Sequence, residues 1–78
     1  MTVEDTVKKV FNQVLDIKSE EIKPDDKLED GLGIDSTEMV EIVVGLKKAF
    51  GIAIADNELK KSHSFNQIVA VLKTKGAK

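Results

Sequence analysis

The sequence contains neither cysteine nor arginine, and it has one histidine and one proline. Without cysteine the chain forms no disulfide and no thiolate metal site, and it has no thiol of its own. Arginine most often reads phosphates and bases through paired hydrogen bonds, so its absence argues against nucleic-acid binding. The apolar runs, such as residues 42–46, are far shorter than a membrane-spanning helix requires.

The length of 78 residues allows one small domain, and we expect residues 1–78 to form it. Apolar residues make up 41% and charged residues 33%, proportions typical of a globular domain and not of a disordered chain. Glu4 and Asp5 stand where a secretory signal would carry basic residues. The sequence therefore predicts a cytoplasmic monomer that does not insert into membranes.

Charge is distributed unevenly along the chain, although the net charge is only −2. Residues 16–41 hold ten carboxylates and three lysines, a balance of −7. Residues 42–78 hold seven lysines and two carboxylates, a balance of +5, and the first fifteen residues balance at zero. In small globular domains, most charged side chains simply lie on the surface in contact with water.

Three segments show the 3.6-residue apolar spacing of amphipathic helices. The predicted helices are Val3–Asp16, Ser36–Ala49 and Phe65–Thr74. Each has a capping-box spacing at its start, in the pairs Thr2–Asp5, Asp35–Glu38 and Ser64–Gln67. Gly51 stands where a glycine usually ends a helix, directly after the second of them.

Residues 17–34 lack this periodicity, and Pro24 breaks any helix there. We expect a long loop with, at most, a helical turn near Asp25–Leu28. Residues Asp56–Lys61 are predicted to form a short helix or turn capped by Asp56. The apolar residues expected to pin the loop to the core are Ile22, Leu28, Leu32 and Ile34. The predicted fold is all-α: a small four-helix bundle of three main helices and one short helix, with a long loop between helices one and two.

The inner side of the second helix is predicted from the spacing of its apolar residues. The residues predicted to share that side are Val40, Val43, Leu46, Lys47 and Phe50, with Met39 and Val44 at its margins. The residues predicted to line the opposite side are Glu38, Glu41, Gly45 and Lys48. Several of these residues are β-branched, so the helix depends on tertiary packing for its stability.

Asp35, Ser36 and His63 supply the residue types of a hydrolytic triad, but two adjacent residues on one turn rarely orient around a third group. No second residue is evident to hold His63, which we expect to lie exposed before the cap at Ser64. A bundle of this size also offers little room for a cleft that excludes water. The sequence therefore predicts that the protein is not an enzyme.

Four carboxylates near the start of the second helix could gather and hold calcium or magnesium loosely: Asp30, Asp35, Glu38 and Glu41. Oxygen ligands suit those hard cations, yet the chain has no EF-hand spacing. We therefore predict no metal centre.

The segment that distinguishes this chain is Leu32-Gly33-Ile34-Asp35-Ser36. Asp35 is the predicted N-cap and Ser36 the first helical residue, which leaves the serine hydroxyl facing water. The start of a helix has unpaired N–H groups and partial positive charge, so it tolerates a phosphate. On its own the pattern more often marks a plain helix cap, because aspartate and serine are common there.

With its surroundings, this segment resembles the acyl carrier protein family. The matching continues through Val40, Glu41, Leu46, Phe50, Gly51, Ile52, Ile54 and Asp56. It also includes the first helix and the apolar positions of the last, and so covers nearly the whole chain. The resemblance implies that a phosphopantetheinyl transferase attaches 4′-phosphopantetheine from coenzyme A to Ser36, beside Asp35. That arm would supply the missing thiol, hold acyl groups as thioesters and present them to acyl-loading and condensing enzymes of fatty acid, lipid or polyketide-type biosynthesis.

The sequence departs from the family at positions that partner enzymes would contact. Thr37 stands where the family usually has leucine, and Lys47 and Lys48 stand where it is typically acidic. Glu38 and Glu41 keep the negative charge near the start of the helix. The resemblance implies that these five residues form a recognition surface, and their departures favour a specialised carrier over the main carrier of fatty acid synthesis.

Two other functions remain open from the sequence. A small helical interaction or regulatory module without a prosthetic group would use Ser36 only to start a helix and would need an exposed apolar patch. An aminoacyl or peptidyl carrier would bear the same arm, but Asp35 before the serine favours the acyl type.

Overall fold

The computed structural model describes residues 2–55 and 57–77. Its elements are α1 (Val3–Leu15), a 3₁₀ turn (Ser19–Glu21), α2 (Leu28–Gly31), α3 (Ser36–Phe50) and α4 (Phe65–Thr74). The described residues contain no β-strand, only an isolated antiparallel bridge between Lys27 and Ser64. The predicted all-α class is confirmed.

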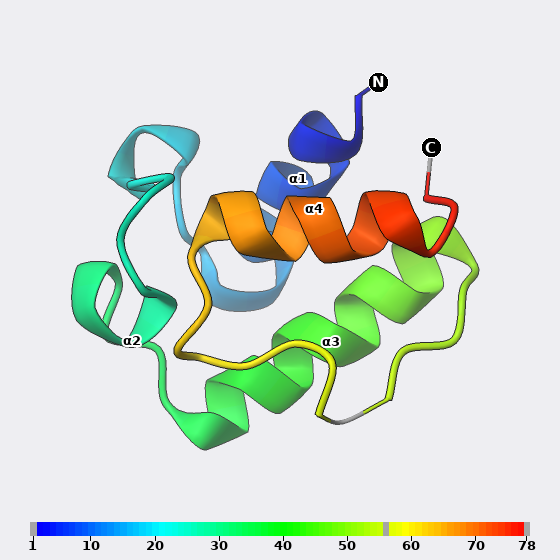
Figure 1. Ribbon diagram of the computed structural model, residues 1–78. Helices are drawn as coiled ribbons and strands as arrows, with labels where there is room; N and C mark the ends of the chain where they lie inside the picture. The colour runs from blue at the N-terminus through cyan, green and yellow to red at the C-terminus, as the bar shows by residue number, and fades with distance from the viewer. Residues whose placement is uncertain (1, 56, 78) are drawn as a thin grey trace.

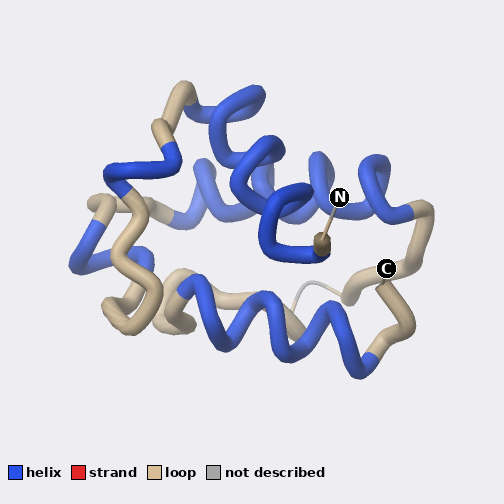
Figure 2. Tube along the Cα trace, turned by 90° about the horizontal axis from the view of Figure 1, so that it is seen from above, coloured by secondary structure: helices blue, strands red, loops and turns tan. Residues whose placement is uncertain are grey.

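Helix α1 lies at the centre of the packing, because it contacts both α3 and α4. In Figure 1, α4 crosses in front of α1, and α3 runs obliquely below them. Figure 2 shows the same three helices from above, with loops joining them at the periphery. The start of α1 and the end of α4 lie on the same side of the molecule, where Lys73 Nζ is 3.4 Å from Glu4 Oε2.

The predicted capping boxes are present at all three main helices, and α4 has the predicted bounds. Helix α1 ends at Leu15, one residue earlier than predicted, because Asp16 adopts a left-handed conformation with φ of 57°. Helix α3 ends at Phe50, one residue later than predicted. Gly51 follows with φ of 65° and donates its N–H to the carbonyl of Lys47, so the predicted glycine end is confirmed.

The core lies between the three main helices and is closed by residues of the loops. Phe11 of α1 and Phe65 of α4 meet edge to face there, with ring centroids 6.0 Å apart. All four predicted loop anchors contact the core: Ile22, Leu28 and Ile34 are buried and Leu32 is half-buried. The long loop is therefore an ordered part of the fold.

The buried side of α3 differs from the prediction. Ile42 is fully buried, whereas Val40 and Val44 are 63% and 42% exposed. Gly45, predicted to face outward, faces α1: a Cβ atom there would lie 2.8 Å from Val10 Cγ1. Other residues predicted on the inner side are buried or half-buried, namely Val43, Leu46, Lys47 and Phe50. Apolar residues occupy several sides of this helix, so contact with α1, and not spacing alone, decides which side is buried.

Backbone hydrogen bonds fasten the loop before α3 to the segment before α4. The N–H groups of Leu28 and Glu29 donate to the carbonyl oxygens of His63 (2.9 Å) and Lys61 (3.0 Å). Both N–H groups belong to the first turn of α2, where a helix leaves them without an internal partner. The helical turn therefore starts at Leu28 and does not occupy the predicted stretch Asp25–Leu28.

The segment predicted as a short helix or turn at residues 56–61 contains no helix in its described part, residues 57–61. Asp56 lies outside the described residues, and residues 57–61 form turns and a bend without helix. Glu58 Oε1 accepts a hydrogen bond from the N–H of Ala55 at 2.7 Å. The same reach-back bond occurs in a capping box, but here the N–H of Glu58 donates to the carbonyl of Ala55 at 3.0 Å and the described residues continue as turns. The fourth, short helix of the bundle is thus α2, at a different place in the chain from the one predicted.

Candidate functional site

Ser36 is the first residue of α3, and its side chain is exposed, as predicted. The capping bonds run between its neighbours. Asp35 Oδ1 accepts from the N–H of Glu38 at 2.8 Å, and Glu38 Oε1 accepts from the N–H of Asp35 at 3.1 Å. This cap does not use the Ser36 hydroxyl, so the serine is held in place while its oxygen stays available for reaction.

The chain enters α3 through a turn that fixes the position of the serine. Gly33 has φ of 65°, a left-handed conformation that glycine adopts without strain. Ile34 is 3% exposed, and its N–H donates to the carbonyl of Leu28 at 3.2 Å. Met39, three residues after Ser36, is also buried. Buried side chains on both sides therefore anchor the exposed serine.

The start of α3 is electrostatically suited to an attached phosphate. The N–H groups of Ser36 and Thr37 donate to no acceptor among the described residues. Unpaired N–H groups and the positive end of the helix dipole together stabilise an anion. The nearest carboxylates, those of Asp35 and Glu38, already accept backbone hydrogen bonds in the cap.

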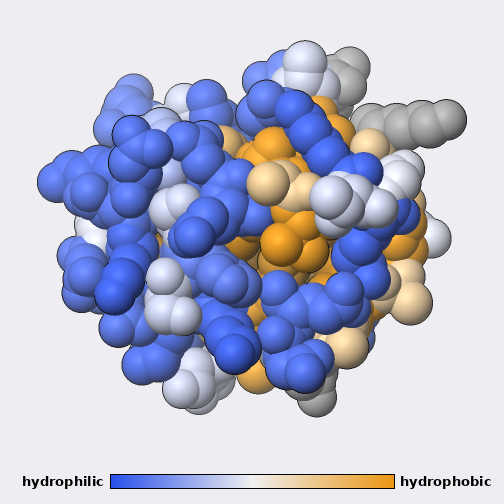
Figure 3. All heavy atoms as spheres, viewed as in Figure 1, coloured by the Kyte–Doolittle hydropathy of each residue, from blue (hydrophilic) through white to orange (hydrophobic). Residues whose placement is uncertain are grey.

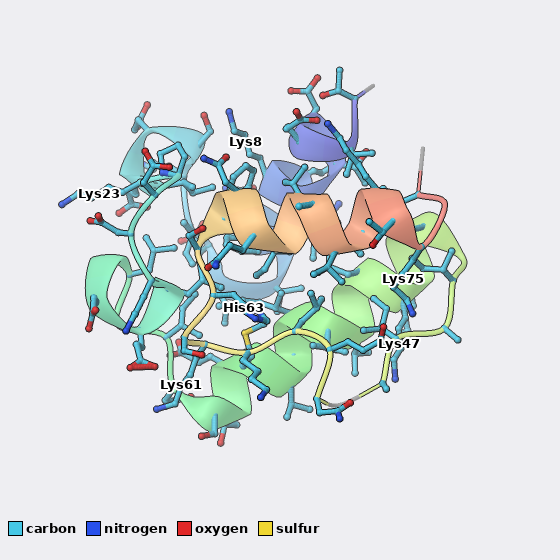
Figure 4. All side chains as sticks on the ribbon, viewed as in Figure 1. Lys8, Lys23, Lys47, Lys61, His63 and Lys75 are labelled. Atoms are coloured by element: carbon cyan, nitrogen blue, oxygen red, sulfur yellow. The ribbon has the colours of Figure 1, made fainter. Side chains whose placement is uncertain are left out.

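A cleft of about 540 Å³ extends from Ser36 between α3 and residues 59–62. Its apolar lining consists of Met39, Val40, Val43, Val44 and Leu59. Its polar lining consists of Ser36, Glu29, Lys47, Lys60, Lys61 and Ser62. Figure 4 shows Lys61 and Lys47 toward opposite ends of α3. The sequence did not predict this cleft, because it placed Val40 on the buried side and left a helix possible at residues 56–61.

His63 is half-buried, not exposed as predicted, and it is held within its own turn. Its Nδ1 accepts a hydrogen bond from the N–H of Lys60 at 3.0 Å. Its carbonyl oxygen accepts the bond from Leu28 that ties α2 to this segment. No hydrogen bond among the described residues links His63 to Ser36 or Asp35, so the structure does not assemble the three into a triad.

Comparison with known proteins shows the family to which the chain belongs. Residues 5–72 match the family model described as a phosphopantetheine attachment site. The acyl carrier protein of Nitratidesulfovibrio vulgaris (strain DSM 19637 / Miyazaki F) is 31% identical over 96% of this chain and 99% of its own. The acyl carrier protein of Wolinella succinogenes is 34% identical over 95% of this chain and 97% of its own. That of Buchnera aphidicola subsp. Acyrthosiphon pisum is also 34% identical, over 97% of this chain and 95% of its own. The chain belongs to the acyl carrier protein family.

Membership of the acyl carrier protein family confirms the predicted resemblance and the predicted class of cofactor. The chain contains a phosphopantetheine attachment domain and has the function of an acyl carrier protein. Members of the family are carriers, not catalysts, and they work with a phosphopantetheinyl transferase and with biosynthetic enzymes.

The residues of this carrier fit such a group. Ser36 offers an exposed hydroxyl, and the adjoining N–H groups favour the charge of a phosphodiester. The cleft that begins at the serine has an apolar lining suited to an acyl chain.

The five residues predicted to contact partners of the carrier all lie on α3, but they are not equally available. Thr37, Glu41 and Lys48 are exposed, whereas Glu38 and Lys47 are half-buried. Glu38 is engaged in the cap, and Lys47 lines the cleft. The two lysines occupy the last turn of α3, where positive charge complements the helix dipole.

The remaining predicted features concern metals and membranes. In residues 2–55 and 57–77, no group of three or more metal-ligating side chains could hold an ion, so the structure does not gather Asp30, Asp35, Glu38 and Glu41 into a site. No helix in the described part of the chain has the length and apolarity to cross a bilayer. Figure 3 shows hydrophilic atoms over α2 and the loop before it, with apolar atoms gathered over α4.

Proposed function

We propose that Ser36 carries 4′-phosphopantetheine and that residues 1–78 form one cytoplasmic, monomeric carrier domain. The observation that carries this proposal is the exposed hydroxyl of Ser36 at a helix start held by the Asp35–Glu38 cap. During attachment, the hydroxyl loses its proton and Oγ bonds to phosphorus, while the nucleotide half of coenzyme A leaves.

The chain and the arm divide the work between them. The terminal thiol of the arm holds acyl groups as thioesters, chemistry that no residue of this cysteine-free chain supplies. Asp35 acts as a positioning residue, because its cap fixes the turn on which Ser36 stands. The fold then presents the acyl group to enzymes of fatty acid, lipid or polyketide-type biosynthesis.

Intact mass measurement tests the attachment site. The purified protein is incubated with coenzyme A and a broad-specificity phosphopantetheinyl transferase, and one arm per chain is expected. Ser36→Ala should abolish the addition. Ser62→Ala is the matched control, because Ser62 is also exposed and lines the same cleft, and it should be modified like the wild type. Modification that persists in Ser36→Ala would sink the assignment.

The surface of α3 changes sign along its length, and we propose that partner enzymes recognise this. Glu41 is exposed toward the start, and Lys47 and Lys48 lie at the end. Val40 and Val44 expose apolar surface near the middle of the same helix. A partner that fits must present positive charge near the attachment serine and negative charge beyond it. Such a partner differs in its charge pattern from general fatty acid synthase enzymes, because the family resemblance implies that those bind a helix that is typically acidic where Lys47 and Lys48 stand.

Charge reversal tests this recognition. Lys47→Glu with Lys48→Glu should raise kcat/KM for acyl transfer by general fatty acid synthase enzymes, by roughly tenfold at low salt. The control Lys9→Glu with Lys23→Glu changes the net charge equally at exposed positions away from α3, and it should have little effect. The proposal is wrong if the wild type already matches an ordinary acidic carrier and reversal changes nothing.

A further inference from the structure

The cleft beside Ser36 has both apolar and cationic lining residues, and a neutral acyl chain would need only the apolar ones. Val40, Val44 and Leu59 offer apolar contact. Lys47, Lys60 and Lys61 supply three positive charges at the same cleft, and Glu29 supplies one negative charge. The described residues of the lining therefore carry a net charge of +2, although the segment that leads into α3 is strongly acidic.

These three lysines form no ion pair with any residue that the structure describes. Within the residues that the structure describes, ion pairs join Lys73 to Glu4 and Lys75 to Glu58, and no other lysine is paired. Lys60 and Lys61 are exposed and Lys47 is half-buried. Lysine side chains commonly lay their alkyl stems along apolar surface and keep the ammonium group at its edge. We therefore expect the cleft to have an apolar interior with cationic groups around it.

This combination favours one class of ligand on physical grounds. A neutral acyl chain gains from the apolar lining only, and filling the cleft removes water from the ammonium groups without giving them a partner. A chain with an apolar stem and an anionic end gains from both, because its charge forms charge-assisted hydrogen bonds with lysine.

We propose that this cleft receives an acyl group that ends in a carboxylate, and that Lys47, Lys60 and Lys61 select this cargo over neutral acyl groups of the same shape. The inference rests on the proposed attachment at Ser36, since the serine lines the cleft and a group joined there starts at its end. The phosphodiester that joins the arm to Ser36 is a second anion that the three lysines could bind. The experiment therefore distinguishes binding of the acyl carboxylate from binding of this phosphodiester.

The test compares two cargoes of matched shape on the intact protein. Adipoyl and 6-methylheptanoyl arms are transferred to Ser36 from the corresponding coenzyme A thioesters, so that an isopropyl group replaces the carboxylate in the second. The adipoyl carboxylate carries ¹³C and is titrated by NMR. Its pKa should lie about half a unit to one unit below that of adipoyl-pantetheine free in solution. The amide signals of Val40, Val44 and Leu59 should shift more with adipoyl than with 6-methylheptanoyl.

A pair of triple variants assigns the effect to the cleft. Lys47→Gln/Lys60→Gln/Lys61→Gln should return the carboxylate pKa to the free value. The control Lys9→Gln/Lys18→Gln/Lys23→Gln removes the same charge at exposed positions that do not line this cleft, and it should leave most of the shift in place.

Three results would overturn the proposal. The carboxylate could titrate as it does on free pantetheine, or the amide shifts could be equal for both cargoes. The cleft variant could also alter the spectrum of the unacylated arm as much as that of the adipoyl form, which would assign the lysines to the phosphodiester. Absence of any mass increase during loading is a separate outcome: it would remove the proposed function, and this inference with it.

Discussion

The two sides of α3 are built in different ways. Toward α1, Ile42 and Leu46 are fully buried, and Gly45 brings the helix within contact of Val10; we call this the packed side. Away from α1, Val40 and Val44 remain exposed beside the cleft; we call this the open side. The packed side holds Ser36 in a fixed place, and the open side leaves room for the group that we propose the serine carries.

The walls of the two sides also differ in what stabilises them. The packed side is formed by interlocking apolar side chains, which stabilise a fold through close contact and the exclusion of water. The far wall of the cleft is a loop anchored by one buried side chain, Leu59, together with hydrogen bonds and one ion pair, including the contacts of Glu58 with Ala55 and Lys75. Changes on the packed side should therefore affect stability far more than changes on the open side.

The largest expected effect comes from emptying the packed side. Leu46→Ala removes a fully buried side chain and should lower the free energy of unfolding by about 2–5 kcal/mol. Val40→Ala on the open side, at 63% exposure, should change it by no more than about 0.5 kcal/mol. Urea unfolding of both variants measures the difference. Equal costs would show that the two sides do not differ in packing.

A smaller loss is expected from crowding the packed side. Gly45→Val places a Cβ atom 2.8 Å from Val10 Cγ1 and 3.0 Å from Val14 Cγ2, closer than van der Waals contact allows. Overpacking of this kind should cost about 1–3 kcal/mol, less the gain in helix propensity over glycine. Ala49→Val adds the same branching at an exposed position of α3 and should be nearly neutral. A Gly45→Val protein as stable as the wild type would mean that α1 moves aside readily.

The smallest effect should come from the loop opposite α3, as the loss of one carboxylate contact when the pH falls. The hydrogen bonds from Lys75 Nζ, at 2.9 and 2.8 Å, followed by the one from the N–H of Ala55, hold the pKa of Glu58 below its usual value of 4.5. A carboxyl group whose pKa is lowered by folding stabilises the fold above its unfolded pKa. That stabilisation is lost as the pH falls below about 4.5 and through the folded pKa.

Thermal unfolding across this pH range tests the role of Glu58. The Tm of the wild type should fall more steeply below pH 4.5 than the Tm of Glu58→Gln, which lacks the titrating group. Glu20→Gln removes a charge at an exposed position of the 3₁₀ turn and serves as the control. Identical slopes for wild type and Glu58→Gln would show that the Glu58–Lys75 contact does not stabilise the folded state.

Much of the fold could be predicted because its signals are local. The capping pairs at Thr2, Asp35 and Ser64 act over three residues, so the starts of the main helices follow from neighbouring residues alone. The exposed position of Ser36 follows from the same signal. The glycine that ends α3 is local in the same way, since only its own φ matters.

The features that the prediction missed depend on contacts distant in sequence. The turn of α2 begins where His63 and Lys61 provide acceptors for its first N–H groups, more than thirty residues further along the chain. The outward position of Val40 and the inward position of Gly45 are set by where α1 packs. Local periodicity contains no information about either partner.

Ser36, the proposed attachment site, and the cleft beside it show this division most clearly. A capping motif of a few residues is enough to put Ser36 at an exposed helix start, because hydrogen bonds between near neighbours define a helix terminus. The cleft joins α3 to Lys60 and Lys61, which are far from it in the chain. Only tertiary packing brings these lysines to the serine, since burial of the apolar core determines which surfaces are left facing each other.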